Sequence, residues 1–399
     1  STRPATVRVR YAPSPTGYLH LGGLRTALFN YLFAKSHGGD FLMRIEDTDQ
    51  TRKVEGSVEA LTKSLQWCGI HEDEGPTAGG NFGPYVQSER LHVYKSYADT
   101  LVEVSKTSHE YQSIRSCRWM DRLKSLRDSA ARSGSGTMYD RACLGLDQGQ
   151  IDEKLARGDP HTIRLKVPEG KTTLKDLVRG YVQFDHSVVD DQVLMKSDGF
   201  PTYHLAHVVD DHLMGITHVI RGEEWLSSTP KHLLLYKFLG FRLPEFAHLG
   251  LLLNEDRSKL SKRQGDVAVE DFQKKGFLAP ALVNFVALLG WNPSDGNKQE
   301  IFSLDELQSV VRRATCPTMC ERFGVVFHGP RQQEWLRCKH RTTSLDQLQA
   351  HPTPLRHCRQ SRRCGDASPV LGGPHPPVGD IQRRLYLVRC ITDEGAFHF

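Results

Sequence analysis

The feature of this chain that most limits its fold is a strand, a helix and a second strand inside its first 45 residues. Residues 7–11 alternate apolar and polar side chains over the length of a strand, and residues 41–45 form a second short strand-like run. Between them, residues 22–36 place leucine, alanine and tyrosine at helical spacing, and the pair Gly38-Gly39 ends the helix. Two strands joined through a helix run parallel, so the sequence predicts an α/β fold with a parallel sheet.

This α/β pattern is interrupted and then resumes. Residues 159–199 are richer in short β-like runs, and strand and helix alternate again from residue 217 to about residue 253. A chain of 399 residues also exceeds what one compact core usually holds. The sequence therefore predicts the first half of an α/β domain at 1–104, an inserted α+β module at 105–200, the second half with the start of a helical region at 201–311, and an aberrant, poorly folded tail at 312–399.

The tail differs from the body in charge and composition. From Ala314 to Phe399 it holds 12 Lys and Arg against 7 Asp and Glu, so the net charge of +5 lies in the tail and the first 313 residues are balanced. The tail also holds eight prolines and six of the nine cysteines, without a period of 2 or 3.6. We interpret it as a frameshifted, misassembled or alternatively spliced end. A weaker alternative is a zinc site at Cys316, Cys320, Cys338 and His340.

Composition also bears on the class of protein. No run of 18 or more apolar residues exists, so we expect no membrane-spanning helix. Because the charge of the body is balanced, a nucleic-acid partner would need a local basic patch there. The body cysteines Cys68, Cys117 and Cys143 are far apart and do not suggest a disulfide framework, so we expect a reducing compartment. No secretory leader is visible at Ser1, although the chain lacks an initiator Met.

The turn between the first strand and the first helix is the first candidate site. Residues 10–23 read Arg-Tyr-Ala-Pro-Ser-Pro-Thr-Gly-Tyr-Leu-His-Leu-Gly-Gly. Glycine lets a phosphate approach the backbone, and a helix N-terminus offers free N–H groups and positive potential. His20 can donate a hydrogen bond to a phosphate oxygen there. For Gly22-Gly23 alone, an ordinary strand-to-helix turn is the more frequent explanation.

A basic loop far along the chain is the second candidate site. Residues 259–263 read Lys-Leu-Ser-Lys-Arg. Mobile cations close together suit a triphosphate, because charge develops on its oxygens during reaction. A solvated basic loop is the competing explanation, and it is the usual one for a run of charges.

The two sites in this order resemble the His-x-Gly-x and Lys-rich signatures of class I aminoacyl-tRNA synthetases. Further motifs narrow the resemblance to glutamyl-tRNA synthetases of the bacterial and organellar type, over residues 7–104 and 138–310. These motifs lie at residues 12–17, 44–49, 83–85, 87–90, 201–206 and 221–225.

The resemblance implies a Rossmann-like class I catalytic domain of α/β type with an inserted module that binds the tRNA acceptor stem. It implies an enzyme, a glutamate–tRNA ligase, in which the α-carboxylate of L-glutamate attacks ATP to give glutamyl-adenylate and pyrophosphate. The acyl group then passes to tRNA(Glu). ATP is a substrate, and Mg²⁺ is expected with it, held mainly through phosphates and water. Alternatives left open are additional charging of tRNA(Gln), a truncated paralogue that glutamylates a modified tRNA base, and an inactive form.

The resemblance also implies which residues bind L-glutamate. Glutamate carries two carboxylates and one ammonium, so its site needs fixed cations and an anion. Arg10 and Arg221 match the substrate-binding arginines of the family, and Glu46 matches the acid that faces the amino group. The other residues implied are Tyr11, Ala12, Ser14, Tyr203, His204, Leu205, Ala206 and His207.

For ATP, the resemblance implies His20 at the phosphates and Glu224 on the adenosine side. Lys262 is the principal cation for pyrophosphate, so His20, Lys262 and Lys259 are the expected catalytic residues. The remaining residues of the ATP site are Gly22, Leu260, Ser261 and Arg263.

Each of these residues also has a purely structural explanation. Arg10 on a strand could pair with Glu46, and Arg221 could pair with Glu223 or Glu224, because structural ion pairs are frequent. Because these residues occur together and in order within one family pattern, the functional explanation is favoured.

The sequence departs from the family pattern at two single residues, in one internal segment and in the tail. Gly23 stands where other class I branches have a second His, and His207 stands where many members have Asn, with a charge that depends on pH. Residues 105–136 do not resemble the family, and a local reading-frame error is one hypothesis for them. Because only Cys117 and His109 are available there, we expect no protein-bound zinc.

The tail is the largest departure, because the family continues there into a helical anticodon-binding region. We expect Ala314–Phe399 to be poorly packed, and the chain to keep adenylate chemistry but lose tRNA selection. The resemblance further implies a monomer in the mitochondrial matrix, with the bacterial cytoplasm as the alternative location.

Overall fold

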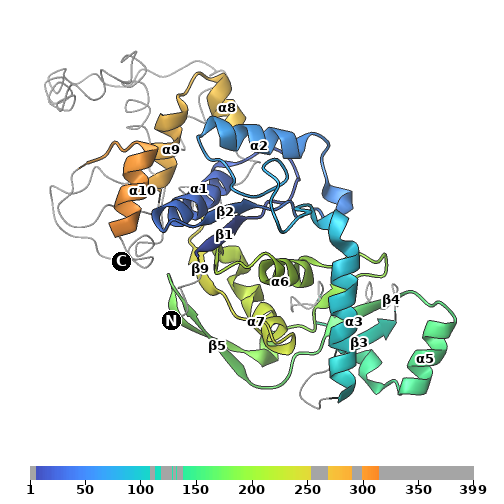
Figure 1. Ribbon diagram of the computed structural model, residues 1–399. Helices are drawn as coiled ribbons and strands as arrows, with labels where there is room; N and C mark the ends of the chain where they lie inside the picture. The colour runs from blue at the N-terminus through green and yellow to red at the C-terminus, as the bar shows by residue number, and fades with distance from the viewer. Residues whose placement is uncertain are drawn as a thin grey trace, which may run out of the picture.

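The computed structural model of the chain describes residues 6–107, 113–117, 128, 132, 138–252, 268–289 and 299–313 (Figure 1). The Lys-rich loop, with Lys259, Leu260, Ser261, Lys262 and Arg263, lies outside the described residues. So do the tail from residue 314 and most of residues 105–136. The predictions about those segments stay predictions.

The N-terminal unit confirms the strand–helix–strand prediction. Strand β1 (Arg8–Tyr11) pairs in parallel with β2 (Asp40–Met43), with Arg8 opposite Asp40. Helix α1 (Leu21–Ser36) connects them and is buried along most of its length. Its buried side chains join the first of two apolar cores, which also takes in α9 (Ala279–Ala287) and α10 (Leu304–Arg313).

The second half of the parallel sheet returns to the first half. Strand β8 (His218–Gly222) pairs in parallel with β9 (Glu245–Leu249), with α7 (Thr229–Phe238) between them. The Thr217 N–H donates to the carbonyl of Arg8 at 2.9 Å, which sets β8 beside β1. The carboxyl ends of β1 and β8 therefore meet at one edge, where ligands of open α/β sheets bind. The predicted α/β fold with parallel strands is confirmed.

The inserted segment forms a small antiparallel sheet. Strand β4 (His161–Leu165) lies between β3 (Ser113–Cys117) and β7 (Val193–Met195). Helix α5 (Gln148–Ala156) begins at a capping box, in which Asp147 and Gln150 each accept a backbone N–H of the other residue. This mixture of strands and helix agrees with the α+β character predicted for the insertion.

The hairpin of β5 (Lys171–Asp176) and β6 (Gly180–Asp185) differs from the expectation. It falls within the range predicted for the inserted module, yet β5 pairs in parallel with β9 through Asp176 and Phe246. The strand order is therefore β6-β5-β9-β8, so part of the insertion extends the catalytic-type sheet. Pairing between strands 70 residues apart leaves no local signal in the sequence.

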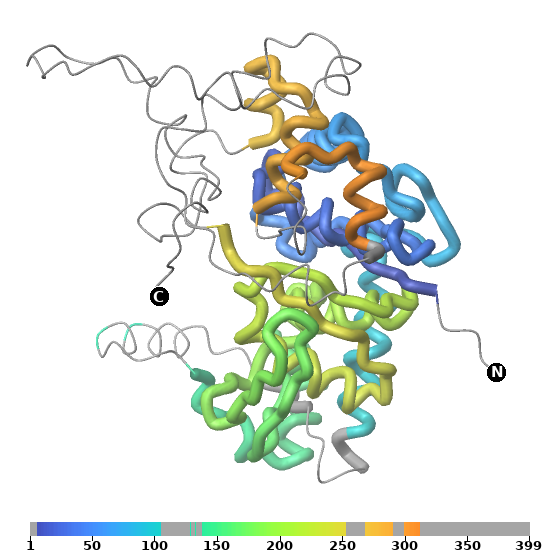
Figure 2. Tube along the Cα trace, turned by 90° about the vertical axis from the view of Figure 1, so that its left-hand side faces the viewer, coloured from blue at the N-terminus to red at the C-terminus, as the bar shows by residue number. Residues whose placement is uncertain are grey.

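A second apolar core lies under α6 (Tyr203–Leu213), α7 and α3 (Leu91–Thr107). Figure 2 shows α1, α2, α8, α9 and α10 gathered at one end of the molecule and the inserted segment at the other. No helix in the described ranges is long and apolar enough to cross a membrane. The shorter elements are η1 (Gln50–Arg52), α2 (Ser57–Trp67), η2 (Gln87–Arg90), η3 (Ala142–Gly145), η4 (His186–Val188), η5 (Glu223–Ser228) and α8 (Val269–Lys274).

Candidate active site

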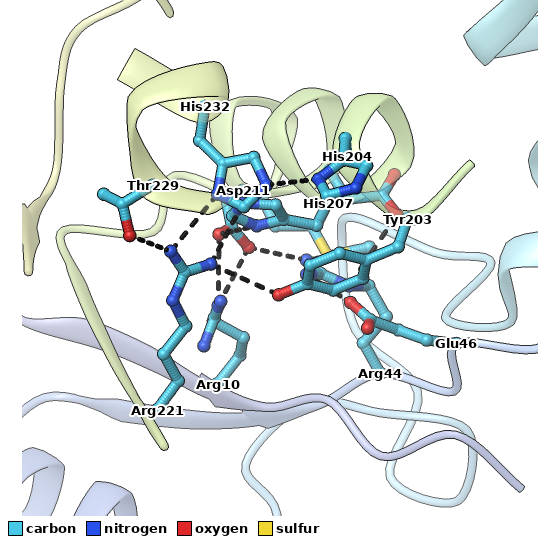
Figure 3. Close-up of polar contacts among 12 residues, drawn as sticks. Arg10, Arg44, Glu46, Tyr203, His204, His207, Asp211, Arg221, Thr229 and His232 are labelled. Carbon is cyan, nitrogen blue, oxygen red and sulfur yellow. Dashed lines mark hydrogen bonds and ion pairs between the residues drawn. The ribbon is translucent and has the colours of Figure 1, made fainter. Parts of the chain in front are cut away.

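One face of α6 supplies the polar side chains above the sheet edge. Tyr203, His207 and Asp211 recur every four residues, so they share a helix face, and Figure 3 shows them gathered around Arg10 and Arg221. The aromatic ring of Tyr203 stacks on that of His207, with the ring centroids 5.0 Å apart. The four-residue spacing on α6 thus brings three side chains that can accept hydrogen bonds to the carboxyl ends of β1 and β8.

Two predicted substrate residues do not join this face. Leu205 and Ala206 are fully buried among the apolar side chains of the second core. Their side chains face the apolar interior, and their assignment to glutamate binding stays a prediction. The sequence alone placed the whole run from Tyr203 to His207 in the site without resolving the faces of the helix.

Arg10 pairs with the carboxylate of Asp211 and not with Glu46. Its Nε lies 2.9 Å from Oδ1 and 3.2 Å from Oδ2 of Asp211, and the residue is only 3% exposed. Within the described part of the chain, the side-chain hydrogen bonds of Arg10 leave from Nε. The two terminal nitrogens of its guanidinium therefore remain available to a ligand.

Asp211 is shared between two arginines. Arg44 Nη1 lies 2.9 Å from Oδ1 of Asp211, so one carboxylate faces the guanidinium groups of Arg10 and Arg44. Burial alone would raise the pKa of Asp211, but the two arginines outweigh it and hold that pKa well below its ordinary value. The cluster of Arg10, Arg44 and Asp211 thus carries a net positive charge.

Arg221 is held by neutral groups. It is 5% exposed, at the end of β8, and its Nη2 donates to Oγ1 of Thr229 at 2.9 Å. It forms no ion pair with any carboxylate of the described residues, so the alternative of a structural pairing with Glu223 or Glu224 does not hold. Its other acceptors are the Tyr203 hydroxyl at 3.2 Å, His248 Nε2 at 3.1 Å, His232 Nδ1 at 3.2 Å and His207 Nε2 at 3.4 Å.

The imidazoles around Arg221 are neutral. Burial lowers the pKa of His207 to about 3, and it also lowers the pKa values of His232 and His248. The expectation that the charge of His207 varies with pH is therefore wrong near neutrality. His207 instead bridges the two arginine sites, because its Nδ1 lies 3.0 Å from Oδ2 of Asp211. A neutral ring can donate a hydrogen bond from Nδ1–H to Asp211 and accept one from Arg221 at Nε2.

Glu46 follows β2 and lies close to the arginines without pairing with Arg10. Its Oε1 accepts from Nη2 of Arg44 at 3.1 Å. Burial raises the pKa of Glu46 to about 7, although the charges of Arg44 and Arg10 oppose this rise. Glu46 thus lies beside Arg44 at the sheet edge as an acid that is readily neutralised.

His20 caps the first turn of α1. Its Nδ1 accepts the N–H of Gly23 at 3.1 Å, and the residue is exposed. A neutral ring in this arrangement carries its proton on Nε2. His20 also forms an isolated β-bridge with Ala268, and the N–H of Val269 donates to the carbonyl of Leu19 at 2.8 Å. The chain that follows residues 253–267 therefore returns beside His20.

Gly23 is required by a close approach. A Cβ at this position would lie 2.8 Å from the hydroxyl of Tyr11 and 3.0 Å from the side chain of Leu19. A side chain at residue 23 would therefore require the Tyr11 hydroxyl or the Leu19 side chain to shift.

The other predicted residues lie around this cluster. Tyr11 is buried at the end of β1, Ala12 is half-buried and Ser14 is exposed on the following turn. Nδ1 of His204 lies 2.9 Å from Nε2 of His232, behind Arg221. Glu224 is exposed in η5, and its carboxylate occupies the space beside Gly222 where a Cβ would stand.

Sequence reasoning missed several residues of the cluster. The spacing of four between His207 and Asp211 was a usable signal, because it sets both on one face of a helix. Arg44 stood inside a quoted motif but received no role. Thr229, His232 and His248 reach Arg221 only through the tertiary fold and had no local signal.

Comparisons with known proteins identify the family of the chain. The family model for "tRNA synthetases class I (E and Q), catalytic domain" matches residues 6–322. The glutamate–tRNA ligase of Chloroherpeton thalassium is 59% identical over 310 residues, which are 76% of this chain and 60% of that protein. That of Chlorobaculum parvum is 55% identical over 308 residues, with 75% and 60% covered. The chain thus spans about 60% of the length of these curated relatives.

A solved structure is similar as well. The glutamate tRNA ligase of Elizabethkingia meningosepticum, in complex with its amino acid, superposes with a TM-score of 0.76 at 38% identity. The match covers 84% of this chain and 69% of that one. The family resemblance seen in the sequence is confirmed. With its parallel sheet and these matches, the chain belongs to the class I tRNA synthetases of the glutamate and glutamine family.

Proposed function

We propose that this chain activates L-glutamate with ATP and transfers it to tRNA(Glu). The observation that carries the proposal is Arg221, a buried guanidinium that is fixed by neutral acceptors and forms no ion pair with a described carboxylate. Arg10 stands beside it with its terminal nitrogens unused within the described residues. A ligand with two carboxylates supplies an anion for Arg221 and a second one for the terminal nitrogens of Arg10, whose Nε already pairs with Asp211.

The ammonium group of glutamate is assigned to Glu46. Its carboxyl has a pKa near 7 because burial disfavours its ionised form. A bound ammonium replaces the lost solvation and favours ionisation. Tyr203, which donates or accepts through its hydroxyl beside Arg221, completes the substrate site, and Tyr11, Ala12 and Ser14 supply the turn next to it.

ATP is assigned to the first turn of α1. This helix terminus offers backbone N–H groups and positive potential to the phosphates, and His20 stands at its cap. Lys259, Lys262 and Arg263, as cations for the pyrophosphate, remain part of the proposal, with Glu224 on the adenosine side. The assignment of residues 259–263 to the ATP site is supported by the β-bridge between His20 and Ala268, because Ala268 follows that loop closely in the sequence.

In the proposed first step, an oxygen of the glutamate α-carboxylate attacks the α-phosphorus of ATP. The bond from that phosphorus to the bridging oxygen breaks, and pyrophosphate leaves with the electron pair. In the second step, the terminal ribose hydroxyl of tRNA attacks the acyl carbon, loses its proton, and AMP leaves. Cations fixed beforehand stabilise the charge that develops on the phosphate oxygens.

Mg²⁺ would enter with ATP, coordinated mainly by phosphate oxygens and water. In the described ranges, no three His, Cys, Asp or Glu side chains are grouped so as to hold a metal ion. The absence of protein-bound zinc stays a prediction, because His109 and the side chain of Cys117 lie outside the described part.

The inserted segment is proposed to bind the acceptor stem, and the chain to act as a monomer. Charging of tRNA(Gln) in addition to tRNA(Glu) stays an open proposal. The two relatives named above are bacterial, which favours the bacterial cytoplasm over the mitochondrial matrix as the location.

ATP–pyrophosphate exchange tests the proposal. The purified chain is assayed with L-glutamate, with tRNA(Glu) or tRNA(Gln), and without tRNA. Exchange that requires glutamate and is increased by tRNA(Glu) is the expected result. A chain that is folded by circular dichroism, binds glutamate and yet shows no exchange under any of these conditions would contradict the proposed reaction.

A further inference from the structure

A second buried carboxylate reaches Arg221 through an imidazole. Asp176 ends β5, and its Oδ2 lies 2.6 Å from Nδ1 of His248 on β9. Nε2 of the same ring accepts from Nε of Arg221 at 3.1 Å. Asp176 is 2% exposed and His248 is fully buried, so no solvent competes for these bonds. The carboxylate, the imidazole and the guanidinium are thus linked by consecutive hydrogen bonds.

Asp176 determines which nitrogen of His248 carries the proton. An ionised carboxylate only accepts hydrogen bonds, so the ring must present Nδ1–H to it. The lone pair of Nε2 then faces the N–H of Arg221. The opposite tautomer would set an N–H at Nε2 against the N–H of Arg221, and the Thr229 hydroxyl at 3.2 Å would be the acceptor left to it among the described residues. Burial lowers the pKa of His248, so the ring stays neutral and keeps this lone pair.

The remaining oxygen of Asp176 holds the local backbone. Oδ1 accepts the N–H groups of Val178 at 2.9 Å, Arg179 at 3.0 Å and His248 at 3.3 Å. These bonds fix the carboxylate itself. Asp176 is therefore rigid at one oxygen and directs the histidine with the other.

We propose that Asp176 is a positioning residue, which acts through His248 to hold the Arg221 guanidinium ready for a substrate carboxylate. This inference rests on the proposed function, in which Arg221 binds glutamate. Groups that support a ligand-binding side chain from behind fix its orientation and are costly to replace. The hairpin of β5 and β6, which interrupts the α/β domain in the sequence, thus takes part in the substrate site.

Asp176→Asn is the sharpest test. Asparagine has nearly the same shape and keeps one oxygen for the three backbone N–H groups. Its amide nitrogen donates to Nδ1, which moves the proton of His248 to Nε2, opposite Arg221. We expect the dissociation constant for L-glutamate, measured by calorimetry on the whole chain, to rise roughly 5- to 100-fold. We also expect KM for glutamate to rise while KM for ATP is unchanged.

Asp191→Asn is the matched control. Asp191 is another buried carboxylate, which accepts the N–H of Val167 at 2.9 Å and pairs with Arg141 at 2.8 Å. It makes no contact with His248 or Arg221 in the described structure. Its substitution removes a comparable buried charge and should leave glutamate affinity unchanged. An equal loss of affinity in both variants would contradict the inference.

Two further measurements separate positioning from a general structural role. In the His248→Gln background, Asp176→Asn should lose its effect on glutamate affinity, because the imidazole that transmits it is gone. A full effect in that background overturns the inference. Nitrogen NMR of histidine-labelled wild-type chain should show His248 protonated at Nδ1, and protonation at Nε2 overturns it without any variant.

Arg221→Gln distinguishes this inference from the proposed function. If Arg221→Gln weakens glutamate binding but Asp176→Asn does not, the positioning role is wrong and the substrate site stands. If Arg221→Gln leaves glutamate binding unchanged, the proposed substrate site falls, and the positioning role falls with it.

Discussion

At the scale of single residues, the site depends on how each charge is neutralised. Arg10 and Arg44 share the carboxylate of Asp211, whereas the hydrogen-bond acceptors of Arg221 among the described residues are two hydroxyl groups and neutral imidazoles. A buried charge without a partner is costly, so its retention indicates a ligand that supplies the opposite charge. The sequence predicted that Arg10 and Arg221 belong to the substrate site, but it could not show which carboxylate pairs with each arginine.

The pH dependence of glutamate binding is predicted from Glu46. Burial raises its pKa to about 7, against the charges of Arg44 and Arg10, while Asp211 adds to the rise. A ligand ammonium favours the ionised acid, so affinity for glutamate should increase between about pH 6 and pH 8. Calorimetry across this range measures it. Glu46→Gln should bind weakly and lose most of this dependence.

The free energy of unfolding should change with pH in the opposite direction to the affinity for glutamate. Because the folded pKa of Glu46 is raised, its contribution to the free energy of unfolding is fully present below the ordinary pKa and is lost as pH rises through about 7. Glu46→Gln should remove this decline, whereas Glu59→Gln on the exposed side of α2 should not. A binding curve of the wild-type chain that is flat from pH 6 to pH 8 would contradict the assignment.

At the scale of elements, the local pattern predicted some features and missed others. The unit of β1, α1 and β2 was predictable because the alternation and the helical period are local signals. The pairing of β5 with β9 was not, because it depends on contacts 70 residues apart. The burial of the Leu205 and Ala206 side chains was unpredictable for a related reason, since the buried face of a helix depends on the elements that pack against it.

The contact between α1 and β1 gives a prediction about packing. A Cβ at residue 23 would meet the Tyr11 hydroxyl at 2.8 Å, so Gly23→Ala should lower the free energy of unfolding by about 1–3 kcal/mol. Urea denaturation measures the loss. Gly22→Ala, whose Cβ would meet only the His20 ring at 3.2 Å, is the neighbouring control and should cost less.

Tyr11→Phe should partly restore the Gly23→Ala variant, because it removes the atom at 2.8 Å and leaves the Leu19 contact at 3.0 Å. No loss of stability in Gly23→Ala would show that the helix and strand can separate at little cost, and the explanation of the glycine would then be wrong.

At the scale of the whole molecule, buried charges join segments that are distant in the sequence. Asp210 on α6 accepts from Arg90 at 2.8 Å, Gln87 at 2.9 Å and the hydroxyl of Tyr94 at 2.8 Å. The motif at residues 87–90 is thus explained by the structure as an anchor between α3 and α6. The sequence identified that motif as a family mark but offered no physical reason for it.

Asp210→Ala is predicted to destabilise the whole chain. The substitution leaves Arg90 buried without its carboxylate, which should lower the free energy of unfolding by roughly 3–5 kcal/mol. Asp99→Ala on α3 removes an exposed pair with Lys95 and should change it by less than about 1 kcal/mol. Thermal unfolding of both variants compares them, and equal shifts would contradict the anchoring role.

The central claim is that Arg10 and Arg221 bind the two carboxylates of one amino acid, and calorimetric titration with L-glutamate and L-glutamine tests it most directly. Glutamine has the same size but a neutral amide, so the wild-type chain should bind glutamate far more tightly. Arg10→Gln and Arg221→Gln should each cost about 2–5 kcal/mol of glutamate binding, while Arg242→Gln, at an exposed position before β9, should cost almost nothing. Equal binding of the two amino acids, or unchanged binding in both arginine variants, would contradict the claim.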